Sequence, residues 1–231
     1  MNASSSLTLP WTLANEFRPI AVELLRGYFT AQTNDGFTGA HFERLGGGGD
    51  RPEVACEFTA EDLVAVTMLS VKVPAEAALR ILGPDRSRLS ELLREIRSDR
   101  NLVDVDASEI AAGWVPWLLH DALSDLTGLG RTTVSKLIAR KRPRLIPIYD
   151  REVNKVLALN KGPLWRQLAV SLQADGQALH QHLLALRDES GIGDDISPLR
   201  VLDVIVWRTG KGHADKLRAR GVNPAPDGAD N

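Results

Sequence analysis

The sequence predicts an all-α, multi-helix globular fold. Almost every periodic stretch has apolar residues at the helical spacing, and no pair of alternating strands is bracketed by a hairpin turn. The composition, 43% hydrophobic and 25% charged, is that of a globular protein with a core. We expect residues 1–219 to form a single helical unit or two packed helical lobes, followed by a disordered tail over 220–231.

Caps and prolines predict the helix boundaries in the first half of the chain. Thr59 followed by Asp62 has the pattern of a capping box, so a helix is expected to begin at Ala60. Pro74 suits a helix start, and Gly83 a helix end. Pro116 is expected to bend or split the helix that contains it. The helices expected in this half span 17–30, 60–71, 74–83, 85–98 and 107–123.

The second half is equally helical in pattern. Its expected helices span 131–141, 151–157, 163–173, 176–187 and 198–207. The last of these has almost no polar face and should be buried on most sides, with Arg200 as the nearest partner for Asp203. The run 145–148 could be extended. The glycine run 46–49 lacks the Lys and Ser/Thr of a phosphate-binding P-loop and predicts a flexible loop.

Several classes of protein are excluded by composition. One Cys excludes a disulfide framework and any Cys-cluster metal site. The five His residues show no metal-ligand spacing, and no nucleophile elbow of the Gly-x-Ser-x-Gly type occurs. No apolar run approaches the length of a membrane helix. We therefore expect a cytoplasmic protein with no metal, no cofactor and no membrane partner.

The charge is unevenly distributed. The net charge is −2, yet six basic residues lie between Arg131 and Arg144, and no acidic residue lies between Leu126 and Tyr149. One concentrated basic segment in an acidic chain indicates a localised anion site. The alternative is a solvated helix face followed by a basic loop.

A Gly-x-Gly turn, Gly128-Leu129-Gly130, precedes the helix expected at 131–141. Glycine adopts positive φ at little cost, and the N–H groups that begin a helix have no partner within it. Such a turn between two helices can grip a phosphate, with the helix dipole and basic side chains acting on the same anion. This is the logic of a helix-hairpin-helix, which we expect over 117–141.

The segment 126–156 resembles the helix-hairpin-helix of the endonuclease III-like DNA glycosylase superfamily. Leu126, Gly128 and Gly130 match the hairpin, a proline falls in the loop, and Asp150 lies at the spacing of the catalytic Asp. The resemblance implies a DNA-glycosylase-like fold, backbone contacts to duplex DNA and a catalytic role for Asp150. The expected DNA-backbone-binding residues are Gly128, Gly130, Arg131, Thr132, Lys136, Arg140 and Lys141.

The segment also departs from that family. Thr132 stands where strand-cleaving members have a Schiff-base Lys, so the resemblance implies at most a monofunctional base-excision enzyme. Arg151 and Glu152 replace the Thr-His that usually follows the Asp. The whole chain also resembles an uncharacterised family of high-GC bacteria, which implies no activity.

Two other interpretations remain open at this point. In the first, the protein is a non-enzymatic helical module, the hairpin is structural or a docking site, and Asp150 is only a helix N-cap. In the second, the basic segment binds another anion, such as RNA or a phosphorylated small molecule. Tyr149 could pack in the core or line a base pocket.

Overall fold

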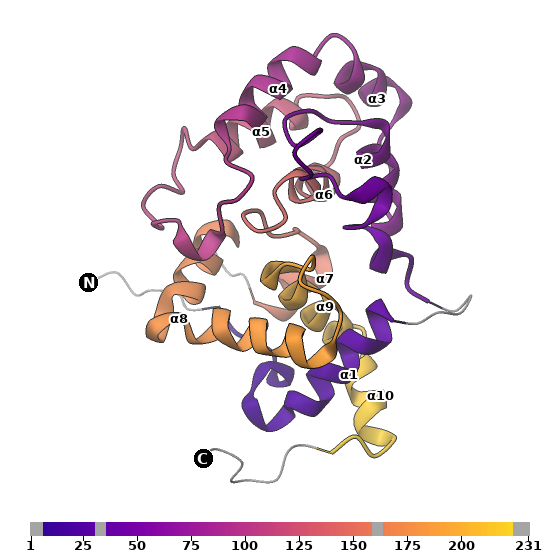
Figure 1. Ribbon diagram of the computed structural model, residues 1–231, viewed down its shortest axis with the longest axis vertical. Coiled ribbons are helices and arrows are strands. Elements are labelled where there is room, and N and C mark those ends of the chain that lie inside the picture. Colours follow the sequence, from indigo (N-terminus) through magenta and orange to yellow (C-terminus); the bar gives the residue numbers. More distant parts are fainter. Residues whose placement is uncertain (1–6, 31–35, 159–163, 224–231) are drawn as a thin grey trace. The chain divides into compact units, whose positions relative to one another are not determined.

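The computed structural model describes residues 7–30, 36–158 and 164–223, and every regular element within these ranges is a helix (Figure 1). The all-α prediction is confirmed. The α-helices of the described residues are α1 (Arg18–Phe29), α2 (Ala60–Ala65), α3 (Ala75–Leu82), α4 (Arg86–Glu95), α5 (Val115–Ser124), α6 (Arg131–Lys141), α7 (Arg151–Val156), α8 (Leu164–Ser190), α9 (Pro198–Gly210) and α10 (His213–Ala219).

The chain divides into two compact units. Unit 1 combines residues up to 37 with residues from 150 onward and contains α1 and α7 to α10, whereas unit 2, residues 38–149, contains α2 to α6. The chain therefore passes between the units after Phe37 and after Tyr149. Residues 224–231 of the expected tail lie outside the described residues.

Unit 1 is organised around α9, which contacts α1, α7, α8 and α10. Every residue of α9 from Pro198 to Val206 is buried, as its apolar sequence predicts. The hydroxyl of Ser197 caps this helix by accepting the N–H of Arg200 at 3.2 Å. Arg200 also donates to the carboxylate of Asp203, so the partner predicted for that acid is confirmed.

Unit 2 is organised around α6, which contacts α2, α5 and the short 3-10 helix η5 (Val66–Leu69). All residues of α6 from Thr133 to Lys141 are buried, including its basic ones. A helix that is enclosed in this way needs an acceptor for each buried cation.

Most expected boundaries agree with the structure to within a few residues, and the caps explain why. The capping box of Thr59 and Asp62 is present at the start of α2. α5 begins at Val115 and not near 107, because Pro116 fits the first turn of a helix but not its interior. α8 contains a non-helical stretch over 174–177, which separates the two helices that the sequence predicts there.

Two other expectations concern stretches outside the α-helices. The glycine run 46–49 overlaps the 3-10 helix η4 (Leu45–Gly47), has positive φ at Gly46, Gly47 and Gly48, and is held by Arg51, which donates to the carbonyls of Gly46 and Gly48. The run 145–148, which the sequence leaves free to be extended, forms no strand. α10 has no counterpart among the expected helices. No helix within the described ranges has the length and apolarity to span a bilayer.

Candidate nucleic-acid interface

α5 and α6 contact each other and are joined by a turn, at the place where the sequence predicts a helix-hairpin-helix. Leu126 and Leu129 anchor the turn from inside, with exposed fractions of 4% and 7%, and the N–H of Leu129 donates to the carbonyl of Leu126 at 3.1 Å. The other turn residues, Thr127, Gly128 and Gly130, are exposed, as is Arg131 at the start of α6. The buried leucines thus hold the turn in place while both of its glycines remain exposed.

The two glycines of the turn differ in backbone conformation and in the space beside them. Gly128 has φ of +83°, a left-handed conformation that other residues adopt only with strain, and a Cβ there would lie 2.8 Å from Cγ of Pro74. Gly130 is the N-cap of α6 in an extended conformation, and a Cβ there would meet no atom within 4 Å. Because Gly130 provides no side-chain cap, the first N–H groups of α6 are left for solvent or a ligand.

Arg131 and Tyr149 stack beside this turn. The guanidinium carbon of Arg131 lies 4.0 Å from the centroid of the half-buried Tyr149 ring. The N–H of Tyr149 donates to Oγ of Ser135 at 3.0 Å, and this hydroxyl donates to the carbonyl of Thr132 at 3.1 Å. Tyr149 is therefore tied to the first turn of α6. The sequence contains no local signal for this pairing.

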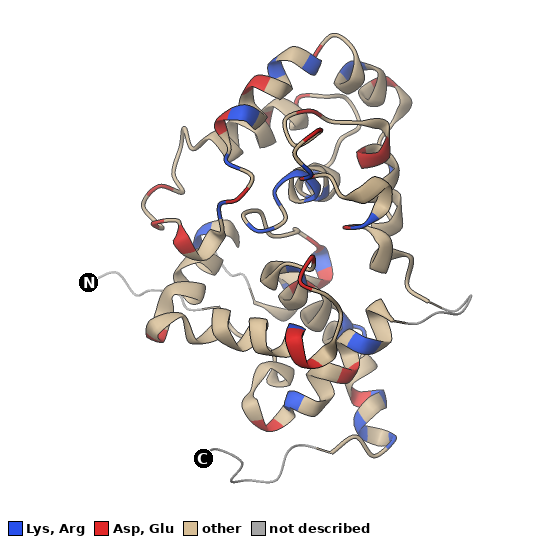
Figure 2. Cartoon of the chain, viewed as in Figure 1, with Lys and Arg blue, Asp and Glu red and all other residues tan. Residues whose placement is uncertain are grey.

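The other basic residues of α6 do not form the exposed surface that the sequence predicts. Lys136, Arg140 and Lys141 are only 4%, 2% and 0% exposed, and Thr132 is half-buried. Figure 2 shows basic residues gathered on α6 and the loop after it, within unit 2. The expectation that Lys136, Arg140 and Lys141 face solvent is wrong, because segment 42–69 covers them and provides their acceptors.

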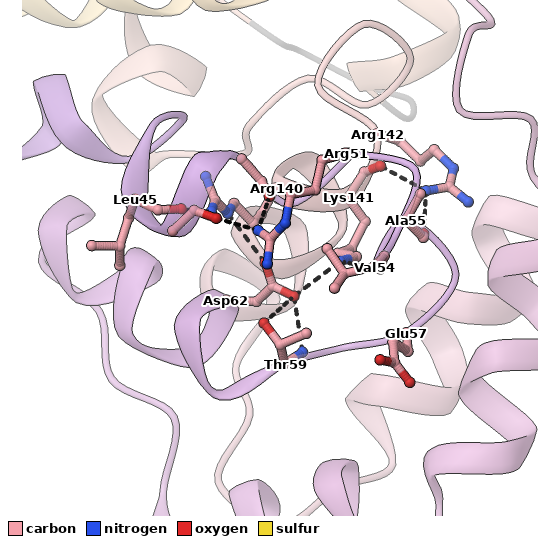
Figure 3. A network of polar contacts seen from close by, with 12 residues as sticks. Leu45, Arg51, Val54, Ala55, Glu57, Thr59, Asp62, Arg140, Lys141 and Arg142 are labelled. Atoms are coloured by element: carbon pink, nitrogen blue, oxygen red, sulfur yellow. Dashed lines mark hydrogen bonds and ion pairs between the residues drawn. The ribbon is translucent and has the colours of Figure 1, made fainter.

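Asp62 lies between two of these buried cations (Figure 3). Its Oδ1 is 3.2 Å from Nε of Arg140, and its Oδ2 is 3.0 Å from Nζ of Lys141. Oδ2 also accepts the backbone N–H of Thr59 at 3.0 Å. One carboxylate therefore caps α2 and pairs with two cations in the last turn of α6. Sequence reasoning identified the cap but not the ion pairs.

The buried cations also donate to backbone carbonyls at helix ends. Nζ of Lys136 donates to the carbonyl of Leu69, where η5 ends, at 2.8 Å. Arg142 donates to the carbonyls of Leu93 and Ile96 at the end of α4. Carbonyls at a helix C-terminus carry partial negative charge, which a cation compensates. The carbonyl of Leu93 also accepts the N–H of Ile96 at 3.2 Å. The other carbonyls outside α6 that accept from Arg140, Lys141 or Arg142 belong to Phe42, Glu43, Leu45, Val54 and Ala55.

Enclosure has an electrostatic cost in this network. Burial lowers the pKa of Lys141, and the charge of Asp62 opposes that shift. Burial likewise lowers the pKa of Arg142. Within 38–149, Asp62 is the one fully buried carboxylate, so backbone carbonyl oxygens compensate much of the positive charge.

Asp150, the expected catalytic residue, is the N-cap of α7. Its Oδ1 accepts the N–H of Glu152 at 2.9 Å, which confirms the capping prediction. The residue is half-buried, and it begins unit 1 directly after Tyr149 ends unit 2. An ionised carboxylate held in this way can stabilise positive charge that develops in a reaction.

Metal chemistry has no candidate centre in the described part of the chain. No group of three or more His, Cys, Asp or Glu side chains there is arranged to hold a metal ion.

The chain matches the model of a protein family. Residues 21–210 match the model of a family described as a family of unknown function (DUF6308). The matched range extends from within α1 to the end of α9, and so includes the hairpin turn and Asp150. No curated protein and no solved structure matches the chain.

Proposed function

The chain belongs to the DUF6308 family, a family of unknown function, and we propose from the geometry of its hairpin that it binds the phosphate backbone of duplex DNA. The observation that carries this proposal is the exposed turn 127–131 ahead of α6. Gly130 leaves the first N–H groups of α6 without a side-chain cap, and Arg131 adds a positive charge beside them. A phosphate placed there would meet N–H donors, the positive end of the helix dipole and a guanidinium.

The lack of a side chain at Gly130 supports this role. A phosphate oxygen must approach to about 2.9 Å to accept a hydrogen bond from a backbone N–H. The open space beside Gly130 gives no packing reason for glycine, since a Cβ would contact nothing within 4 Å. A phosphate that approaches the backbone closely would provide such a reason.

The buried cations of α6 are not part of the proposed interface. Lys136, Arg140 and Lys141 hold α6 in place and have acceptors inside unit 2, so we assign them to the scaffold and not to the DNA contact. The contact is then confined to the turn, the first residues of α6 and Arg131. A small interface of this kind would touch about two phosphates and would not read base sequence.

Binding of a fluorescent duplex, followed by anisotropy at several salt concentrations, tests the proposal. We expect binding at low salt, with a slope of log K against log salt of about −2, because each phosphate contact contributes about −0.9. Gly130→Ala should weaken binding by about tenfold without loss of helicity, since the new Cβ blocks the phosphate but meets no protein atom. Arg131→Ala should weaken binding as well.

The control is Arg94→Ala, which removes an exposed arginine from α4 of the same unit. It makes the same change in net charge and should leave binding unaltered. If duplex DNA does not bind at low salt, or if Gly130→Ala and Arg131→Ala bind like Arg94→Ala, the proposal is wrong. The hairpin would then be a structural element of a non-enzymatic module.

Base excision is a second candidate function, and the placement of Asp150 favours it. The carboxylate is fixed by the N–H of Glu152, which it accepts at 2.9 Å. In such a reaction Asp150 would stabilise the positive sugar as the base departs, or activate water. Thr132 has no amine, so the reaction would stop at an abasic site without strand cleavage.

A further inference from the structure

Unit 1 contains a cluster of basic and aromatic side chains that the hairpin does not involve. Its members, called the Arg208 cluster below, are Arg208, His213, Phe37 and Trp207. The guanidinium carbon of Arg208 lies 5.0 Å from the centroid of the Phe37 ring. The His213 ring lies 5.7 Å from that centroid and 6.0 Å from the Trp207 ring. Phe37, Trp207 and His213 are half-buried, so the cluster reaches the surface.

Arg208 has a buried charge that no described carboxylate neutralises. Its residue is 9% exposed, its Nη1 donates to the carbonyl of Leu24 at 2.5 Å, and its Nε is enclosed without a hydrogen-bond partner. Arg200, two turns earlier on α9, has Asp203 as its counter-ion. Within one helix, one buried arginine is therefore paired and the other is not, although an unpaired buried charge is costly.

A second enclosed nitrogen lies in the same cluster. Nδ1 of His213 is buried and has no hydrogen-bond partner. Burial lowers the pKa of His213, and the charges of Arg208, Lys216 and Lys211 lower it further. Of these cations, Lys211 also approaches a carboxylate, that of Glu152, at 3.7 Å.

We propose that Arg208 and His213 bind a small ligand through an oxyanion, a phosphate or carboxylate group, with Phe37 and Trp207 covering its apolar part. An oxyanion would accept hydrogen bonds from the enclosed Nε of Arg208 and Nδ1 of His213 and would supply the missing negative charge. Gly27 assists by letting the guanidinium lie against α1: a Cβ there would be only 3.0 Å from Nη1. The Nη1 side is thereby fixed on the protein, while the partnerless Nε lacks an acceptor.

The test follows the ring resonances of His213 in the full-length protein at constant pH, with His213→Gln used to assign them. Inorganic phosphate and acetate are added in separate titrations, which distinguishes a phosphate ligand from a carboxylate ligand. We expect a saturable shift with at least one of them, and calorimetry should give the same affinity. Arg208→Gln should weaken that affinity by about tenfold or more, because a charged hydrogen bond is lost.

Arg166→Gln is the matched control, since it removes an exposed arginine from α8 in the same unit. It should bind the anion like the unmodified protein. If Arg208→Gln does not fold, His213→Gln provides the second variant, and calorimetry should show weakened binding there too. The proposal is overturned if neither anion shifts the His213 resonances, or if the folded variants of Arg208 and His213 bind as tightly as Arg166→Gln.

Discussion

Arg140 and Asp62 form a buried ion pair in unit 2, with 3.2 Å between Nε and Oδ1 and a separation of 78 positions in the chain. Each side chain is 1% exposed. A buried pair gains little over apolar residues of the same shape, because both charges lose their hydration. Removal of one member of the pair destabilises the fold, because the remaining charge then has neither water nor a partner. Asp62 is the critical member because Lys141 depends on it as well.

Asp62→Ala should therefore destabilise the protein by about 3–5 kcal/mol, the usual cost of leaving a buried charge unpaired. Thermal unfolding followed by circular dichroism measures the effect. The control is Asp99→Ala, which breaks the exposed ion pair with Arg97 and should leave the melting temperature almost unchanged. Equal melting temperatures for the two variants would contradict the assignment of Asp62 as the counter-ion of α6.

The helices and caps could be predicted because their signals are local. Thr59 and Asp62 are three residues apart, and Asp150 accepts a hydrogen bond from an N–H two residues on. Apolar spacing likewise predicted the bounds of α6 and the burial of α9. Such patterns reflect interactions within one or two helical turns, which the order of residues specifies directly.

The burial of Lys136, Arg140 and Lys141 in α6 could not be predicted in the same way. Lys136 and Arg140 are one turn apart, which is the spacing of a solvated helix face. Their acceptors are carbonyls and a carboxylate 67 to 98 residues away in the chain. Backbone carbonyls are present at every residue, so no sequence pattern marks the ones that fold over a given cation. The same holds for Arg131 and Tyr149, which only the tertiary structure brings together.

Gly49→Ala should destabilise unit 2 by about 1–3 kcal/mol, the range for overpacking a tight site. A Cβ at Gly49 would lie 2.5 Å from the carbonyl oxygen of Arg140 and 2.8 Å from Oδ1 of Asp62, and so would push apart the segments that enclose the ion pair. Gly130→Ala is the matched control, because its Cβ meets no atom within 4 Å. Chemical denaturation of both variants should show a lower midpoint for Gly49→Ala alone.

His182 should make stability depend on pH. Burial, and secondarily the charge of Arg18, lower its pKa below 6.5, and its Nε2 is enclosed without a hydrogen-bond partner. The pKa of this His is therefore lower in the folded protein than in the unfolded chain. As the pH falls from neutrality, the unfolded chain binds a proton before the folded protein does, so stability should fall. His182→Gln should reduce the fall in melting temperature between neutral and mildly acidic pH.

The exposed His41 provides the control for this experiment. His41→Gln should keep the pH dependence of the unmodified protein. A His182→Gln variant whose melting temperature falls as steeply as that of His41→Gln would show that the buried ring is not responsible.

Asp150→Asn separates the capping role of this residue from a catalytic one. Asn is as good an N-cap as Asp, so helix α7 should keep its stability, whereas Asp150→Ala should cost about 1 kcal/mol. The amide has no negative charge and cannot stabilise a cationic sugar, so base release should stop while DNA binding continues. Duplexes that carry a panel of damaged or mismatched bases are incubated with each protein, and half of each sample is then treated with alkali to reveal abasic sites.

Each outcome of this assay tests a particular residue. Strands that break only after alkali would agree with base release at Asp150 and with the absence of an amine at Thr132. Strands that break before alkali would contradict the argument from Thr132, because that route requires an imine. Activity that persists in Asp150→Asn would exclude Asp150 as the catalytic carboxylate. If no substrate gives product while DNA still binds, Asp150 is a helix cap and the hairpin serves binding alone, since the cap at α7 requires no chemistry.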